Sequence, residues 1–268
     1  MFRRDSGSPL SRRRPFLSSF LIAALTSFGL TRLDAIQGIA RRNVSPRGGN
    51  RILFLLMKWL LGSFYMAFGP LQVKGARNVP RAGGVIIAPN HTSDCDVTAL
   101  YVALPRWAWF VAKEELFKIP ILGKMMAYYH AFPIRRSGPA DRSAMKQILD
   151  LVGSGEAVVI FPEGKLTEDG YLQEFQQGTA MLALKAGVPV IPAAMNGTRN
   201  VVPYGRLYPI PSFRRVKVRF GPPVDFSGLP EVDRHERLRI ATERIRQGVV
   251  DLVREIAPET LRETARVE

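Results

Sequence analysis

The sequence predicts a single-domain α/β fold in which helices flank one largely parallel mixed sheet. From Gly75 onward, short apolar runs alternate with helical patterns, as in sheets built from strand–helix–strand units. The chain has 268 residues, which is enough for one buried core once a distinct amino-terminal region is set aside. It contains no internal repeat, so a repeat architecture is excluded.

Four segments follow one another along the chain. We expect a basic segment at 1–50, a membrane-associated helix at 51–72, the α/β domain at 73–230, and an amphipathic helix and tail at 231–268. The first segment holds nine arginines, no lysine and two acids, a composition typical of a flexible interfacial tail or of a targeting segment. Its mildly apolar run at 16–30 lacks a clear cleavage site, so both interpretations stay open.

Residues 52–71 are the strongest candidate for contact with a membrane. They read ILFLLMKWLLGSFYMAFGPL and carry one charge, Lys58. Twenty such residues can just span a bilayer, but the central lysine and the aromatic side chains also suit a helix that lies at the interface with its ammonium group reaching outward. A buried amphipathic core helix is the alternative. We expect membrane association and leave its depth open.

Six apolar runs in the α/β domain are predicted strands, because each is short and is bounded by glycine, proline or polar residues. They lie at 85–88, 109–112, 131–134, 157–161, 188–195 and 216–220. In the run at 188–195, two prolines favour a sheet edge or an irregular wall, whereas the apolar side chains favour core packing.

Helices are expected between these strands and after the last of them. One begins near Asp94 and ends at Leu104, before a proline. Apolar positions at helical spacing predict a second helix within 140–152, and flanking glycines bound a short one at 179–186. Between 238 and 256, apolar residues recur every three or four positions with arginine and glutamate between them, which indicates an amphipathic closing helix.

The chain is strongly basic and almost free of cysteine. Lysine and arginine total 38 against 23 acids, a net charge of +15, so the surface is expected to attract phosphates, nucleic acid or anionic lipid headgroups. Cys95 is the single cysteine, which excludes an internal disulfide and a cysteine-based structural zinc site. We predict no bound metal and a reducing, cytosol-facing compartment.

The stretch NHTSDCD, residues 90–96, carries the clearest chemistry in the chain. His91 and Asp96 can together take a proton from a hydroxyl and hold the resulting charge. Five residues rotate by about 140° on a regular helix, so the two side chains meet only if the motif straddles a bend between the strand at 85–88 and the next helix. Two alternatives remain: the polar residues can simply cap a helix, and Asp94 would share a helical face with His91.

Two further polar turns follow predicted strands, at the edge of the sheet where ligands gather in such folds. Arg135 and Arg136 follow one strand and form a guanidinium pair suited to gripping a phosphate, or else a solvated basic turn. Glu163, Gly164 and Lys165 follow another, where the glycine lets the backbone approach an oxygen-rich ligand and the lysine adds a charge. A tight turn with surface charges is the alternative there.

In this order, NHTSDCD, FPIRR, FPEGK and VIPAA resemble the four sequence blocks of the glycerolipid acyltransferases, in particular the 1-acylglycerol-3-phosphate (lysophosphatidate) acyltransferases. The resemblance covers about residues 73–226. It implies that His91 is the general base and that Asp96 orients it. It also implies that Arg136 holds the acceptor phosphate, with Arg135 at a position that is often aspartate.

For the third and fourth blocks, the resemblance implies that Glu163 and Gly164 help to bind the acceptor and that residues 190–194 position the donor or the acceptor. The third block usually continues with threonine, arginine and serine, but here Lys165 is followed by leucine and threonine. Because a lysine does not replace the bidentate grip of an arginine, the acceptor is left open between lysophosphatidate, another lysophospholipid, lyso-ornithine lipid and glycerol-3-phosphate.

The implied reaction moves an acyl group from acyl-CoA or acyl-carrier protein to the sn-2 hydroxyl of a lysolipid, without an acyl-enzyme and without a cofactor. The expected partners are the lipid acceptor, the acyl donor and the membrane surface, with the active site facing the cytosol and organelle targeting by residues 1–50 left open. Cys95 or Ser93 as a nucleophile is disfavoured, since neither has the setting that activates one. The distant alternative is a non-catalytic basic protein that binds lipid or nucleic acid. This alternative does not explain His91 and Asp96. The sequence also contains no recognised nucleic-acid-binding module.

Overall fold

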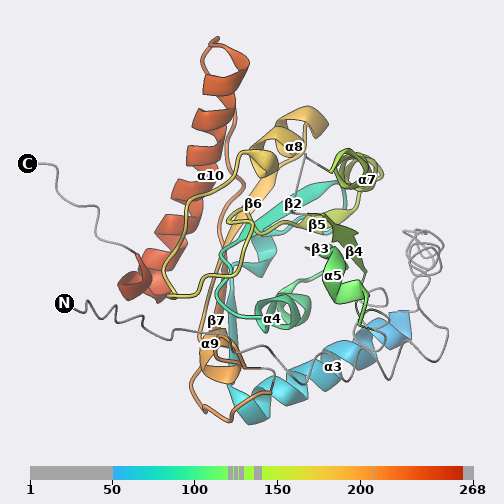
Figure 1. Cartoon of the computed structure of the whole chain (residues 1–268), viewed down its shortest axis with the longest axis vertical. Coiled ribbons are helices and arrows are strands. Elements are labelled where there is room, and N and C mark those ends of the chain that lie inside the picture. The colour runs from blue at the N-terminus through green and yellow to red at the C-terminus, as the bar shows by residue number, and fades with distance from the viewer. Residues whose placement is uncertain are drawn as a thin grey trace, which may run out of the picture.

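The computed structural model describes residues 51–119, 123, 126, 130–135, 141–206 and 208–261. Within this part of the chain, one seven-stranded sheet in the order β1-β7-β6-β2-β5-β3-β4 lies between helices (Figure 1). The predicted α/β fold with a largely parallel sheet is therefore confirmed. The predicted basic segment at 1–50 and the end of the carboxy-terminal tail lie outside the described residues.

Neighbouring strands run parallel at every junction except that between β6 and β7, which is antiparallel. The strands are β1 (Leu71–Lys74), β2 (Val85–Pro89), β3 (Trp109–Lys113), β4 (Ala131–Ile134), β5 (Ala157–Val159), β6 (Val190–Asn196) and β7 (Val216–Phe220). All six predicted strands are present. The sequence does not predict β1, because its residues continue the apolar run of the preceding helix and only pairing with β7 makes them a strand.

The helices alternate with the strands as expected. They are α3 (Arg51–Phe68), α4 (Asp96–Ala103), α5 (Glu114–Phe117), α7 (Arg142–Gly153), α8 (Gly178–Ala186), α9 (Thr198–Val201) and α10 (Arg234–Ile256), with 3-10 turns η1 (Ala76–Asn78) and η2 (Pro258–Thr260). Aspartates begin two of them: the Asp141 carboxylate accepts from the Ala144 amide of α7, and the Asp233 carboxylate accepts from two amides of α10. The short helices α5 and α9 carry too few residues for a periodic pattern and are not predicted.

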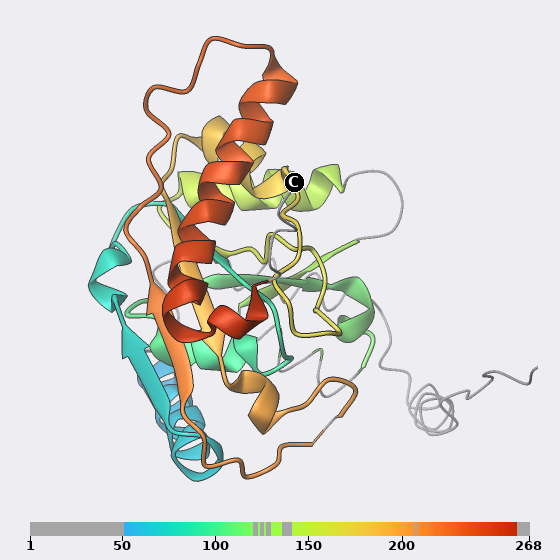
Figure 2. The same ribbon diagram turned by 90° about the vertical axis from the view of Figure 1, so that its left-hand side faces the viewer.

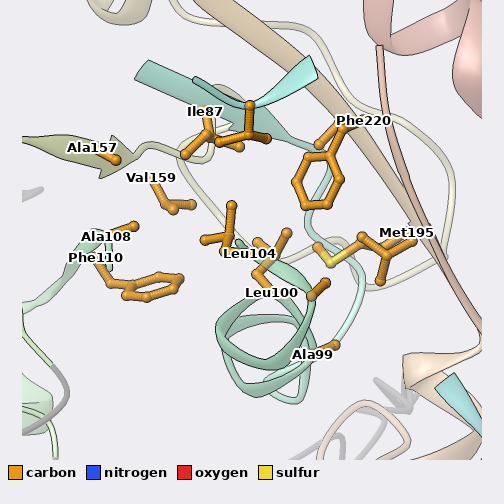
Figure 3. Close-up of a cluster of buried hydrophobic side chains, with 14 of the residues drawn as sticks. Ile87, Ala99, Leu100, Leu104, Ala108, Phe110, Ala157, Val159, Met195 and Phe220 are labelled. Carbon is orange, nitrogen blue, oxygen red and sulfur yellow. The ribbon is translucent and has the colours of Figure 1, made fainter. Parts of the chain in front are cut away.

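Each face of the sheet buries its own hydrophobic core, because successive side chains of a strand point to opposite faces. Ile87 of β2 points toward α4, where it meets Leu100 and Leu104 (Figure 3), and Val85 belongs to the same buried cluster. Ile86 of the same strand points the other way, toward α7, α8 and α10. The central strand is thus buried on both faces, which holds its carboxyl end rigidly in place.

Strand β6 is an interior strand, so the sheet edge suggested by its two prolines is wrong. It lies between β2 and β7, and its apolar side chains are buried, as the core-packing alternative requires. Pro192 stands opposite Gly221, one residue beyond the end of β7, so its missing amide falls at the end of the β6–β7 pairing and not within it. Its carbonyl accepts from the Gly221 amide at 2.9 Å.

Helix α3 packs one face against the domain and exposes the other. Tyr65 is fully buried, and its hydroxyl donates to the Cys95 carbonyl at 2.9 Å. The Lys58 ammonium donates to the Leu104 carbonyl at the end of α4, at 2.6 Å. The outward-reaching lysine expected for this segment is therefore wrong, because the last carbonyls of α4 lie close enough to receive it. No helix in the part of the chain that the structure describes has the length and apolarity needed to cross a bilayer.

Candidate active site

The site begins where β2 ends. The side chain of Asn90 replaces a backbone pairing there: its amide donates to the Met195 carbonyl at 3.1 Å, and its carbonyl oxygen accepts from the Met195 amide at 2.7 Å. Because β6 is held by a side chain instead of by the next backbone group, the chain leaves the sheet at this residue. His91 therefore stands on the bend between β2 and α4.

The bend brings His91 and Asp96 together. Nδ1 of His91 lies 3.0 Å from Oδ2 of Asp96, and the two side chains are 11% and 0% exposed. The histidine ring also stacks on Phe161, with the ring centroids 3.9 Å apart. An imidazole held at Nδ1 by a carboxylate keeps its proton there and leaves Nε2 as the acceptor nitrogen.

Asp96 organises the bend as well as the imidazole. Its Oδ2 also accepts from the amides of Thr92 and Ser93, at 2.6 and 2.9 Å. Asp96 is the first residue of α4, within the helical turn in which it was expected, and it is fully buried. Asp94, the local alternative, is exposed on the outer side of the bend. The polar residues of the motif thus do more than cap a helix.

The loop between β5 and α8 holds the backbone of His91 from both sides. The His91 amide donates to Oε1 of Glu163 at 2.6 Å, and the His91 carbonyl accepts from the Thr167 amide at 3.1 Å. The other carboxylate oxygen of Glu163 accepts from the Gln173 amide at 2.9 Å. Glu163 therefore joins the histidine bend to a second part of the loop.

Burial of Glu163 raises the pKa of its carboxyl to about 7, although the two amide hydrogen bonds lower it. Burial dominates because the side chain lies between the histidine bend and its own loop, where water cannot solvate the charge. The carboxyl group of Glu163 consequently changes its charge near neutral pH.

Gly164 and Lys165 form the turn that follows. Gly164 has a φ of +71°, and a side chain there would collide with Gln176, since a Cβ would lie 2.3 Å from its Nε2 atom. The Gly164 amide donates to the Phe161 carbonyl at 3.0 Å, within the turn. Lys165 is exposed. The contact of both residues with a ligand stays a prediction.

Arg135, the first arginine after β4, lies at the edge of the sheet. Arg135 is 68% exposed at its side chain, and its Nε lies 3.7 Å from Oδ2 of Asp141. Two strands separate β4 from β2, which places the end of β4 roughly 14 Å from the histidine bend at the usual strand spacing. Arg136 lies outside the described residues, so its role stays a prediction.

The disfavoured nucleophiles have other partners or an unsuitable charge state. Burial raises the pKa of the Cys95 thiol to about 11, so the thiol stays protonated at neutral pH. The Ser93 hydroxyl donates to the Val202 carbonyl at 2.8 Å. Neither side chain is bonded to the His91 imidazole in the part of the chain that the structure describes.

Two shallow hollows of about 350 and 280 Å³ lie along α10, and none of the residues described above lines them. Their lining comes mostly from side chains of α10, such as Arg239 and Glu243, and the second hollow also takes in residues of the loop between β5 and α8. Surface grooves between long side chains are common, whereas a buried imidazole–carboxylate pair is rare. We therefore place the candidate site at His91 and not at the hollows.

Comparison with known proteins agrees with the four sequence blocks. The acyltransferase family matches residues 70–196. A 1-acyl-sn-glycerol-3-phosphate acyltransferase of Bacillus subtilis is 31% identical over 191 residues, which cover 69% of this chain and 88% of that protein. The chain belongs to the acyltransferase family.

Other members of the acyltransferase family are similar over shorter stretches. A chloroplastic 1-acyl-sn-glycerol-3-phosphate acyltransferase of Brassica napus is 32% identical over 154 residues, or 57% of this chain, and the chain spans 44% of that protein. The fold of the present chain resembles that of the 1-acyl-sn-glycerophosphate acyltransferase PlsC from Thermotoga maritima, which is known from a crystal structure. The TM-score is 0.58, with 23% identity over 88% of this chain and 96% of that one.

Sequence reasoning missed two groups of residues around the histidine bend. Thr167, Gln173 and Gln176 were not singled out, and no periodic signal marks them, because their role depends on how the loop folds back. Thr198 and Arg199 were missed as well, although they follow β6 just as the chosen residues follow their strands. The rule that ligands gather beyond strand ends would have found them.

Proposed function

We propose that the chain transfers a fatty acyl group from acyl-CoA or acyl-carrier protein to the sn-2 hydroxyl of 1-acylglycerol-3-phosphate, forming phosphatidate. The observation that carries the proposal is the buried pair of His91 and Asp96, 3.0 Å apart, at the carboxyl end of the central strand of an acyltransferase fold. The names of the Bacillus and Brassica relatives support the acceptor.

In the proposed reaction, Nε2 of His91 takes the proton of the sn-2 hydroxyl as its oxygen attacks the thioester carbonyl. The new C–O bond forms a tetrahedral adduct, and the C–S bond then breaks. The departing thiolate takes the proton back from the imidazolium and leaves as the free thiol. Asp96 keeps the imidazole in the productive tautomer and stabilises the imidazolium. No acyl-enzyme and no cofactor take part.

The acceptor phosphate is assigned to Arg136, with Arg135 beside it, and the loop of Glu163, Gly164 and Lys165 completes the acceptor side. Lys165 occupies the position that is usually threonine in the family, and the next residue is leucine where the family usually has arginine. This departure favours a second candidate, in which the same chemistry acts on another acceptor: glycerol-3-phosphate, lyso-ornithine lipid or another lysophospholipid.

We further propose that α3 rests on the membrane surface with its exposed face. Five large apolar side chains of α3 are between 53% and 79% exposed: Leu55, Leu56, Trp59, Leu60 and Met66. The opposite face is taken up by the domain, through Tyr65 and Lys58. A helix with these two faces lies in the interface plane and brings the site to its lipid substrate. We also propose that the active site faces the cytosol, with organelle targeting by residues 1–50 left open.

The test is an acyl-transfer assay with the purified full chain, vesicles, and either acyl-CoA or acyl-carrier protein as donor. A panel of lysophosphatidate, two other lysophospholipids, lyso-ornithine lipid and glycerol-3-phosphate is scored both by thiol release and by identification of the lipid product. We expect the largest kcat/KM with lysophosphatidate. A larger value with another acceptor would favour the second candidate, and no transfer to any acceptor would refute both.

A further inference from the structure

Arg199 lies beside the histidine bend, on the first turn after β6. Its neighbour Thr198 is fully buried, and Oγ1 of Thr198 lies 3.3 Å from Oγ1 of Thr92, the residue that follows His91. The loop between β5 and α8, which grips His91, descends past α10 toward α9 (Figure 2). Arg199 therefore stands between the histidine bend and this loop.

The guanidinium of Arg199 is held in place on two sides. Its Nη2 atom donates to the carbonyl of Glu168, one residue after the amide that holds His91. Its central carbon lies 5.9 Å from the centre of the Tyr204 ring. Gly170 leaves the space that the group fills, since a Cβ at this residue would lie 2.9 Å from Nη1.

One nitrogen of this guanidinium makes no hydrogen bond within the described part of the chain. Nη1 of Arg199 is buried and has no hydrogen-bond partner among the residues that the structure describes. No carboxylate of those residues lies within 4.0 Å of the group, although the Glu168 and Asp94 side chains are in the vicinity of Tyr204. A buried nitrogen without a hydrogen-bond partner on an immobilised, half-buried arginine is costly, and an anionic oxygen would satisfy it.

The sheet order sets Arg199 opposite the arginines of the second block. Strand β6 lies on one side of β2, whereas β5, β3 and β4 lie on the other. Arg199 and Arg135 thus flank His91 from opposite sides along the same edge of the sheet. An acyl transfer of the proposed kind has phosphate on both substrates, so two separated cationic positions match its needs.

We propose that Arg199 binds a phosphate group of one of the two substrates, and that it provides the guanidinium that the third block of this chain lacks. The proposal rests on the proposed function for the identity of the substrates. Its chemistry is that of a charge-assisted hydrogen bond from Nη1 to a phosphate oxygen. The phosphate belongs either to the acceptor or to the coenzyme A portion of the donor.

Two variants and a control test the proposal. Arg199→Gln removes the charge, Arg199→Lys keeps the charge without the planar donors, and Arg206→Gln removes an exposed arginine a few residues further on. KM is measured separately for lysophosphatidate and for acyl-CoA, together with the melting temperature of each variant. We expect one of the two KM values to rise about tenfold or more in Arg199→Gln, less in Arg199→Lys, and not at all in Arg206→Gln.

A rise in the acceptor KM assigns the acceptor phosphate to Arg199, and a rise in the donor KM assigns the coenzyme A phosphate. If neither KM changes by more than about twofold in Arg199→Gln at an unchanged melting temperature, the proposal is overturned. If that variant does not fold, Arg199→Lys decides in the same way.

A binding measurement separates this proposal from the proposed function. Glycerol-3-phosphate and coenzyme A are each titrated into the full-length protein and into Arg199→Gln, and the dissociation constants are measured by calorimetry. A probe that binds the unaltered protein about tenfold more tightly than the variant supports the phosphate site even if no acyl transfer occurs. Equal affinities of both probes for the two proteins overturn it even if acyl transfer is found.

Discussion

A single carboxylate oxygen holds the histidine bend together. Oδ2 of Asp96 accepts from the imidazole of His91 and from two backbone amides of the bend. The same atom therefore sets the tautomer of the base and the path of the chain that carries it. Glu163 acts on the other side, where it receives the His91 amide. The position of the base thus depends on two buried carboxyl groups with separate tasks.

Replacing His91 with alanine tests the base directly. General-base assistance contributes about 10²- to 10⁴-fold, so we expect kcat/KM for acyl transfer to fall by at least that factor in His91→Ala. His235→Ala is the matched control, because His235 is exposed at the start of α10. Activity near that of the unaltered protein in His91→Ala would end the proposed mechanism.

The carboxyl group of Glu163 predicts a pH-dependent stability. Its pKa rises from 4.5 to about 7 on folding, so the fold favours the protonated form. This contribution is complete below about pH 4.5 and is lost as the pH rises through about 7. Glu163→Gln carries no group that titrates at this position, so its stability lacks this pH dependence. Between pH 5 and pH 8, the free energy of unfolding of the unaltered protein should therefore fall relative to that of Glu163→Gln, by up to about 3 kcal/mol.

Urea denaturation at both pH values measures this difference. Glu231→Gln is the control, because Glu231 is exposed and its substitution should give the same difference at pH 5 and pH 8. A difference between Glu163→Gln and the unaltered protein that does not change with pH would show that Glu163 does not titrate in this range.

Among the structural elements, the loop between β5 and α8 is the one that holds the histidine bend. It contacts His91 through Glu163 and Thr167 and is itself closed by the Gln176 amide, which donates to the Pro162 carbonyl at 2.9 Å. The positive φ of Gly164 lets the chain turn back at its start. A change in this turn therefore disturbs the base without touching it.

Gly164→Ala should both strain this turn and push against Gln176. The left-handed backbone alone costs an alanine about 1–2 kcal/mol. The added carbon also displaces the end of the exposed Gln176 side chain, which can move aside at little cost. Gly83→Ala is the matched control, since Gly83 has a φ of +83° but no atom within 4 Å of the added carbon. We expect the two variants to lower the free energy of unfolding by similar amounts, and Gly164→Ala to lower kcat more, because its turn carries Glu163 to the His91 amide. Equal kcat values in the two variants would show that this turn does not position His91.

Helix α3 is the element that meets the membrane in our proposal. Deleting it would remove the buried Tyr65, so substitutions on its exposed face give the cleaner test. Leu56→Ser combined with Trp59→Ser removes two exposed apolar side chains, each of which contributes about 1.5–3 kcal/mol when buried. We expect the affinity for vesicles to fall about tenfold or more, as measured by sedimentation.

Val232→Ser is the control for that experiment, because Val232 is an exposed apolar residue outside α3. The melting temperature of the double variant should stay close to that of the unaltered protein. Unchanged vesicle binding by the double variant would refute the membrane role of α3.

At the scale of the whole molecule, the net charge of +15 adds a second attraction to lipid. Each cation near an anionic bilayer contributes about 1 kcal/mol, and salt screens the attraction. We expect tighter binding to vesicles containing phosphatidylglycerol than to purely zwitterionic vesicles, with the difference shrinking between 50 mM and 500 mM salt. Equal binding to both kinds of vesicle at low salt would exclude this electrostatic contribution.

Much of this protein was determined by local sequence. Strand β2 and helix α4 are recognisable because each is a short apolar run bounded by proline or polar residues. The bend between them is predicted because His91 and Asp96, five residues apart, cannot face each other on one regular helix. The apolar character of α3 is visible in the same way, although the face that it exposes is not. Each of these features depends on neighbours in the chain, which is why its pattern appears in the sequence.

Only the tertiary structure decided the rest, because it depends on residues far apart in the chain. Pairing with β7 makes β1 a strand, and the place where β7 ends makes room for Pro192 inside the sheet. Likewise, no local pattern could join Glu163 to the His91 amide or leave Nη1 of Arg199 buried without a partner among the described residues. Hydrogen bonds between distant segments are selected by how the whole core packs, and that packing leaves no periodic trace in the sequence.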